Sequence, residues 1–185
     1  RRIKTIIDNT WATPIFQNPL DYGIDIVVHS ASKYLGGHSD VVAGVIVGKA
    51  VDITHIFQTE FQNIGTVPDP FMAWLLLRGI RTLQIRMKAH YENTLQIVDY
   101  LAKHPKIEEI LYPFYTKNPQ YGLAKSQMRG GSGLFSFKIK TCDAGKVAEF
   151  TNKLQFFRRA VSWGGYESLV FPYAASHPDA SDDLV

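Results

Sequence analysis

Residues 27–40 read "VVHSASKYLGGHSD", and this stretch decides how the rest of the chain is interpreted. An apolar run stops at His29, two serines and Lys33 follow within four positions, and a pair of glycines comes next. The run from Gly23 to Val28 is continuous and β-branched, which is typical of a buried strand. In α/β sheets, ligands bind beyond the carboxyl ends of the strands. We therefore expect a binding site at Ser30 to Lys33.

A second strand end carries a carboxylate. Ile3 to Ile7 is a short apolar run that predicts a buried strand and ends at Asp8, and the connection to the next strand has room for at most a short helix. If the two strands are neighbours, the Asp8 carboxylate and the Lys33 amine face one crevice. This pair suits pyridoxal phosphate (PLP): a lysine forms a Schiff base with its aldehyde, and a carboxylate keeps the ring nitrogen protonated. Small hydroxyls and backbone N–H groups in the turn would hold its phosphate.

Each of these residues also has a structural explanation. An aspartate at a strand end is often a turn or cap residue, and a lone loop lysine is usually solvated. Ser30 and Ser32 could be turn formers. Only their joint placement favours the cofactor.

Bulk composition limits the class of protein. The 185 residues are 45% hydrophobic, enough to bury a core, and 20 Lys and Arg against 17 Asp and Glu leave no basic surface typical of nucleic-acid binding. No apolar run approaches the roughly 20 residues that span a bilayer. Cys142 is the single cysteine, which fits a reducing compartment, so we expect a cytoplasmic protein. The chain opens without Met and inside an expected strand, so we expect it to be part of something larger.

The remaining periodicity predicts further elements and two domains. Apolar residues at three- and four-residue steps predict a helix from Thr82 to His104, ended by Pro105. We expect a domain boundary near Gly79, with part of a cofactor domain over residues 1–79 and an incomplete smaller domain over 80–185. Further expectations are strands at Val41–Val47, Leu134–Ile139 and Arg159–Ser162, a helix marked by Val147, Phe150, Leu154 and Phe157, and a long polar loop over Asn118–Gly133.

Five motifs resemble one enzyme family along nearly the whole chain. They are "DNTWATP" (8–14), "SASKYLGGHSD" (30–40), "LRGIRTLQIRM" (77–87), "GSGLFSF" (131–137 within "GGSGLFSF") and "VSWGGYESLV" (161–170). In this order and spacing the chain is similar to the cystathionine lyase and synthase family of PLP-dependent enzymes. The resemblance implies an α/β, aspartate-aminotransferase-like (fold type I) structure. In it a mostly parallel sheet has flanking helices, and a smaller C-terminal α/β domain follows.

The resemblance also implies roles for individual residues. It makes Lys33 the lysine that binds PLP covalently and takes the substrate Cα proton, and Asp8 the partner of the pyridine nitrogen. Ser30 and Ser32 match the phosphate-binding hydroxyls, and Thr10 lies beside the ring. Ser162, with Trp163, lines the site near the amino-acid carboxylate of the substrate. No metal site is expected, because the histidines and Cys142 have no metal-ligand spacing.

Members of the family catalyse several related reactions, and the sequence favours one of them without excluding the others. The form "SWGG" at 162–165 resembles β-lyases and favours β-elimination of L-cystathionine to homocysteine, pyruvate and ammonia in methionine biosynthesis. Cystathionine γ-synthase and γ-lyase activities are the close alternatives. Family membership further implies a homotetramer built from dimers and a small amino-acid substrate.

The chain departs from the family pattern at both ends. It begins after the N-terminal half that supplies a stacking tyrosine and further phosphate contacts. The tail "SHPDASDDLV" (176–185) lacks the arginine that binds the substrate carboxylate, and Arg158 and Arg159 do not match that position. A chain with half a site could instead be a non-catalytic folded remnant or an oligomerisation module.

Two other catalytic interpretations are weaker. Ser30-Ala-Ser-Lys33 fits the S-x-x-K signature of penicillin-recognising serine enzymes, but the partner motifs S-D-N and K-T-G are absent. His38, Ser39 and Asp40 have the residue types of a hydrolase triad, but adjacent positions in one loop rarely converge in that geometry.

Overall fold

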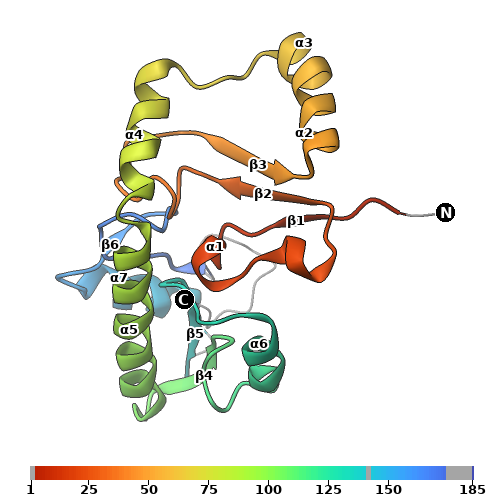
Figure 1. Cartoon of the computed structure of the whole chain (residues 1–185). Helices are drawn as coiled ribbons and strands as arrows, with labels where there is room; N and C mark the ends of the chain where they lie inside the picture. The colour runs from red at the N-terminus through yellow and green to blue at the C-terminus, as the bar shows by residue number, and fades with distance from the viewer. Residues whose placement is uncertain (1–2, 141–142, 174–184) are drawn as a thin grey trace. The chain divides into compact units, whose positions relative to one another are not determined.

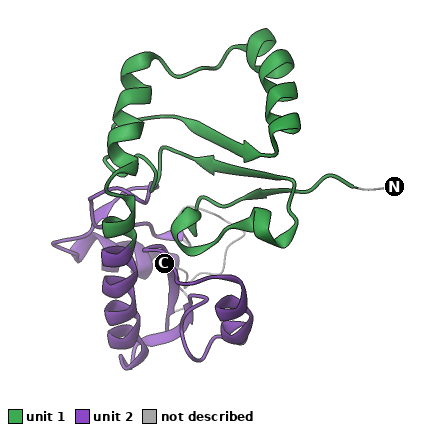
Figure 2. Ribbon diagram, viewed as in Figure 1, with its two compact units in different colours: residues 1–87 green, residues 88–185 purple. Residues whose placement is uncertain are grey.

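The computed structural model describes residues 3–140, 143–173 and 185 of an α/β chain (Figure 1). It divides into two compact units, residues 1–87 and 88–185 (Figure 2). The division falls within helix α5 (Leu83–Ala102), whereas the expected boundary is near Gly79. Within the described residues, no helix combines the length and the apolar character that crossing a membrane requires.

A three-stranded sheet forms the centre of unit 1. Its strands are β1 (Ile6–Asp8), β2 (Ile26–Ser30) and β3 (Gly44–Gly48), in the order β1-β2-β3. β1 and β2 are parallel, with Asp8 opposite Val28. β3 runs antiparallel to β2, which departs from the mostly parallel sheet that was expected. The reason is that the connection between β2 and β3, residues 31–43, contains no helix to carry the chain over the sheet, so the chain turns back beside β2, whereas a parallel pairing usually needs a crossover helix.

The burial of the strands corrects another expectation. β1 is an edge strand of three residues, and Ile6 is 66% exposed, so this strand is not buried as its composition suggested. In β2, burial alternates: Val27 and His29 are buried, while Val28 and Ser30 on the other face are half-buried. The apolar run at 23–28 therefore has one fully covered face.

The connection between β1 and β2 holds only short helical turns, as predicted. α1 (Thr13–Phe16) begins with Pro14 in its first turn, and the 3₁₀ helix η1 (Pro19–Tyr22) ends at Gly23. Gly23 has φ of 87°, a left-handed conformation that glycine adopts without a Cβ clash.

Four consecutive helical segments follow the sheet and are absent from the predicted elements. They are α2 (Ala50–Ile56), the π-helical η2 (Phe57–Phe61), α3 (Gln62–Ile64) and α4 (Pro70–Ile80). α4 has a strong start signal, because the Asp69 carboxylate accepts hydrogen bonds from the N–H groups of Phe71 (2.8 Å) and Met72 (3.0 Å), and Pro70 occupies the first turn.

Unit 2 contains most of α5, two strand pairs and two further helices. The helix predicted over 82–104 is confirmed as α5, and the strand at Leu134–Ile139 is confirmed over β5 (Ser136–Ile139). β5 pairs antiparallel with β4 (Ile107–Leu111), and Val185 extends it through two backbone hydrogen bonds with Phe137. Tyr112 and Val147 are fully enclosed in this unit's core.

Three predictions for unit 2 are wrong in detail. Helix α6 (Tyr121–Gln127) interrupts the supposed loop at 118–133, and the Asn118 side chain accepts from Gln120 N–H just before it. Helix α7 (Ala144–Lys153) ends before Leu154 and Phe157, so these two apolar residues continued the helical spacing by coincidence. The closing strand is limited to β6 (Arg158–Arg159), which pairs parallel with β7 (Leu169–Val170), and Ser162 lies outside it.

Candidate functional site

Asp8 and Ser30 stand at the carboxyl ends of neighbouring strands. β1 and β2 are parallel and directly hydrogen-bonded, so the condition set by the sequence, that the two strands are neighbours, is met. Asn9 N–H continues the pairing by donating to Val28 O (2.9 Å). The edge formed by the ends of β1 and β2 is the position at which α/β proteins bind ligands.

Thr10 connects these two strand ends through its hydroxyl. Ser30 N–H donates to Thr10 Oγ1 (2.7 Å), and Thr10 Oγ1 in turn donates to Asp8 Oδ1. Thr10 N–H donates to the same carboxylate oxygen (2.8 Å). Thr10 is 5% exposed, so its hydroxyl is shielded from competing water. The family resemblance implied that Thr10 lies beside the ring and did not give it this connecting role.

The Asp8 carboxylate therefore has two different oxygens. Oδ1 accepts from Thr10 and stabilises the local turn, as an aspartate in a purely structural role would do. Within the part of the chain that the structure describes, no protein group donates to Oδ2, and the side chain lies at an exposed strand end. One oxygen fixes the orientation of the carboxylate, and the other is available to an N–H donor on a ligand.

Lys33 is presented by a tight turn that follows β2. The turn is closed by Lys33 N–H to Ser30 O (3.1 Å), Gly36 N–H to Ala31 O (2.8 Å) and Gly37 N–H to Lys33 O (2.8 Å). Ala31 and the residues after the lysine are buried, whereas Lys33 itself is half-buried. A half-buried lysine on a rigid, buried turn differs from an ordinary solvated loop lysine.

The two serines of the turn differ in what they contact. Ser32 Oγ accepts from Ala43 N–H (3.1 Å) and lies 3.4 Å from Ala43 O as a long donor, so it helps to close the loop between β2 and β3. No protein partner of the Ser30 hydroxyl occurs among the described residues, although Ser30 N–H is bound to Thr10. The structure therefore gives Ser32 a structural contact and leaves the Ser30 hydroxyl available to a ligand.

The two predicted substrate residues belong to unit 2. Ser162 and Trp163 lie in the segment that joins β6 to β7; Ser162 is exposed and Trp163 is half-buried.

Cys142 and residues 174–184 of the tail lie outside the described residues. His38 Nδ1 contacts Gly36 O (2.8 Å), so this ring is bound to its own turn. No cluster of His, Cys, Asp or Glu that could hold a metal occurs in residues 3–140, 143–173 and 185.

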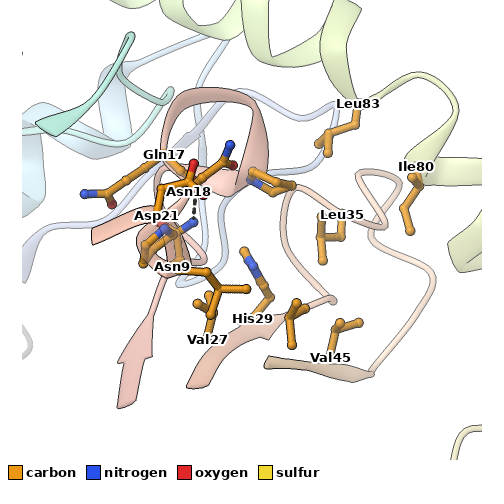
Figure 3. A pocket seen from close by; sticks show the side chains of 14 residues that line it. Asn9, Gln17, Asn18, Asp21, Val27, His29, Leu35, Val45, Ile80 and Leu83 are labelled. Carbon is orange, nitrogen blue, oxygen red and sulfur yellow. Dashed lines mark hydrogen bonds between the residues drawn. The ribbon is translucent and has the colours of Figure 1, made fainter. Parts of the chain in front are cut away.

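A cavity of about 350 Å³ in unit 1 lies on the face of β2 that Val27 and His29 share (Figure 3). Leu35 and Val45 line it, and so does Asn9, whose amide donates to Gln17 O (3.0 Å). The His29 ring points into this space. The period-two pattern of β2 contained the signal for this face, but the sequence interpretation did not use it.

His29 is the most unusual polar group of this face. It is 6% exposed, and its Nδ1 is buried with no hydrogen-bond partner among the described residues. Burial lowers the pKa of His29, and attraction to the Asp8 carboxylate opposes this effect only in part. The ring is therefore held in its neutral form more strongly than an exposed histidine would be.

We expect His29 to make the fold less stable below its ordinary pKa of 6.5. The unfolded chain then binds a proton that the folded chain resists, so the free energy of unfolding falls as the pH drops, by up to about 1.4 kcal/mol per pH unit. Above that pH the contribution is fully present. Urea unfolding between about pH 5 and pH 8 should give a shallower slope for His29→Gln than for the wild type. Equal slopes for His29→Gln and the wild type would contradict the assignment.

Comparison with known proteins gives the chain a family. The model of the family described as Cys/Met metabolism PLP-dependent enzyme matches residues 1–183. This match includes both strand ends, the Lys33 turn and the segment with Ser162.

Relatives with different reactions match at similar levels. A cystathionine beta-lyase of Coxiella burnetii is 43% identical over 171 residues, which are 92% of this chain and 44% of the relative. A cystathionine gamma-lyase of Dictyostelium discoideum is 41% identical over 178 residues, 96% of this chain and 46% of the relative. A cystathionine gamma-synthase of Mycobacterium leprae is 39% identical over 193 residues, 99% of this chain and 49% of the relative. The chain spans about half the length of the curated relatives it matches.

Proposed function

The chain belongs to the Cys/Met metabolism PLP-dependent enzyme family, and from this premise we propose that it carries part of the active site of a PLP-dependent carbon–sulfur lyase. The proposed reaction is β-elimination of L-cystathionine with water to homocysteine, pyruvate and ammonia. The observation that carries the proposal is the hydrogen-bonded connection of Asp8, Thr10 and Ser30 beside the turn that presents Lys33.

The residues at the strand ends fit PLP by their chemistry. Asp8 has a carboxylate oxygen available for the pyridine N–H, and the Ser30 hydroxyl is available for a phosphate oxygen. Lys33 supplies the amine for the aldehyde. Ser32 suits the phosphate as well, because its long contact with Ala43 O is weak enough to be exchanged for a charged acceptor.

Each residue has a distinct task in the proposed reaction. When bound, PLP supplies an electron sink for the negative charge that develops at the substrate Cα. Asp8 holds a proton at the ring nitrogen and so stabilises that charge, while Thr10 keeps the carboxylate oriented. The Lys33 amine would hold the cofactor through its aldehyde, and the same amine would take the substrate Cα proton as general base. We place Ser162 and Trp163 near the substrate carboxylate.

The choice of β-elimination rests on the sequence at the substrate segment. "SWGG" at residues 162–165 favours it, whereas the relatives divide among beta-lyases, gamma-lyases and gamma-synthases. Incubating the protein with PLP and L-cystathionine and identifying the keto acid tests this choice. Pyruvate supports β-elimination, and 2-oxobutyrate as the sole keto acid would transfer the assignment to γ-cleavage.

The proposal includes the setting of the site. We propose the aspartate-aminotransferase-like fold type I, with a cofactor domain that ends near Gly79 and a smaller C-terminal domain. We also propose a cytoplasmic homotetramer that acts on a small amino acid. Light scattering of the purified protein would measure the assembly, and a monomer would contradict it.

The candidate from another class is a non-catalytic remnant that keeps only folding or pairing surfaces. The chain spans about half the length of these relatives, so residues that complete a site in them lie outside the matched segment. PLP titration separates the two possibilities. An enzyme site gains visible absorption that reduction fixes on Lys33, and a remnant does not.

A further inference from the structure

Arg86, in the first turn of α5, binds two segments of unit 1 at once. Its Nη1 donates to Tyr34 O (2.8 Å), directly after Lys33 in the chain, and its Nη2 donates to Gly79 O (2.8 Å) at the end of α4. Its Nε donates to Thr82 Oγ1 (3.0 Å). A planar guanidinium can satisfy three acceptors in different directions, which a lysine ammonium on a flexible stem does not reproduce.

The guanidinium has no carboxylate partner among the described residues, and its three acceptors are neutral oxygens. It is half-buried, and burial lowers the pKa of Arg86. A partly desolvated charge is expensive unless hydrogen bonds compensate for it. Neither solvation of an exposed charge nor an ion pair therefore explains the position of this side chain. Its hydrogen bonds to the two carbonyl oxygens do explain it.

Glycines allow this close approach. A Cβ at Gly37 would lie 2.0 Å from Arg86 Nη1, and Gly37 has φ of +73°, which disfavours other residues. A Cβ at Gly79 would lie 2.3 Å from Gly36 O. The end of the Lys33 turn therefore lies in close contact with the end of α4, and the Arg86 guanidinium contacts both segments.

We propose that Arg86 is a positioning residue that fixes the Lys33 turn. The turn ends with Gly37 N–H donating to Lys33 O, and Arg86 donates to the next carbonyl oxygen, Tyr34 O. The guanidinium therefore ties the end of the turn to the start of α5, and its positive charge favours these carbonyl oxygens electrostatically. The lysine amine is thereby held at one position relative to Asp8. This inference rests on the proposed function of Lys33.

Arg86→Lys tests the inference, with Arg81→Lys as the matched control. Arg81 is an exposed arginine five positions earlier, at the end of α4. In each protein, the PLP fixed on Lys33 is measured by borohydride reduction and peptide mass spectrometry over a range of PLP concentrations. The pH midpoint of the visible absorption of bound PLP is measured in parallel. We expect Arg86→Lys to need about tenfold or more PLP for half-labelling and to shift that midpoint, because charged hydrogen bonds are lost. Arg81→Lys should match the wild type.

The outcomes separate this inference from the proposed function. If the wild type fixes no PLP on Lys33, the proposed function fails. If the wild type is labelled and Arg86→Lys has the same labelling curve and pH midpoint, Arg86 is no positioning residue. If Arg86→Lys lowers the melting temperature but leaves the pH midpoint of the PLP absorption unchanged, the inference also fails, because Arg86 then contributes to stability only.

Gly37→Ala keeps the test decisive if Arg86→Lys does not fold. This substitution retains the guanidinium but places a methyl group 2.0 Å from Arg86 Nη1, so the guanidinium must move away from its present position at Tyr34 O. We expect the same weaker labelling and shifted midpoint. Wild-type values in a folded Gly37→Ala protein would overturn the inference.

Discussion

Lys33→Ala should abolish covalent binding of PLP and reduce any cystathionine cleavage by a factor of about 10² to 10⁴ or more. A factor of about 10² to 10⁴ is expected from the loss of a general base alone, and loss of the covalent link adds to it. The turn itself should survive, because its hydrogen bonds come from backbone groups such as Lys33 N–H and O, which alanine retains. The measurements are the visible absorption after PLP addition and the rate of keto-acid release.

Lys49→Ala is a suitable control for this prediction. Lys49 is exposed and precedes α2 without a side-chain cap bond, so its removal should leave absorption and rate unchanged. Retained visible absorption in Lys33→Ala, fixed by reduction on another lysine, would mean that the cofactor amine has been assigned to the wrong residue.

Asp8→Asn should separate cofactor binding from catalysis. The amide oxygen can still accept from Thr10 N–H, so the turn and the strand pairing should persist. A neutral amide cannot hold a positive charge at the pyridine nitrogen, so the developing negative charge is less well stabilised. We expect the rate of cystathionine cleavage to fall by a factor of about 10² to 10³, similar to the loss of one preorganised electrostatic contact in other enzymes. PLP should still become fixed on Lys33.

Asp25→Asn provides the matched comparison. Asp25 is a buried carboxylate of the same unit, and its Oδ2 accepts from Thr5 N–H (3.1 Å) and Thr5 Oγ1 (3.2 Å) at the opposite ends of the strands. Its substitution should lower the free energy of unfolding by about 1 to 3 kcal/mol, as expected for a disturbed buried hydrogen bond, without a selective loss of rate. If Asp8→Asn loses stability and keeps the rate of the folded protein, Asp8 is a turn residue only.

The chemistry at the strand ends was predictable because it depends on local order. Asp8 and Ser30 follow apolar runs, and strands that succeed one another usually lie side by side, so their proximity followed from sequence. α5 was predictable for a similar reason, since its apolar spacing persists over 20 residues.

Features that depend on distant contacts were not predictable. Arg86 reaches Tyr34 across 52 positions, and nothing near either residue indicates the other. The direction of β3 depends on how its connecting loop closes.

Two other features have local signals in the sequence. The period-two pattern of β2 marks the buried face that Val27 and His29 share. Asp69 and Pro70 form a start signal for α4, which apolar spacing alone does not detect.

The Thr10 hydroxyl links the pairing of β1 with β2 to the binding of a ligand at Asp8, so each equilibrium affects the other. It accepts from the backbone of β2 and donates to the acid of β1, and only a group able to do both can replace it, as serine can and valine cannot. Any molecule that binds Asp8 should therefore also stabilise the exposed edge strand β1 against separation from β2. By mass action, saturation with such a molecule would slow amide exchange in β1, so occupancy of the site could be followed in the backbone of that strand.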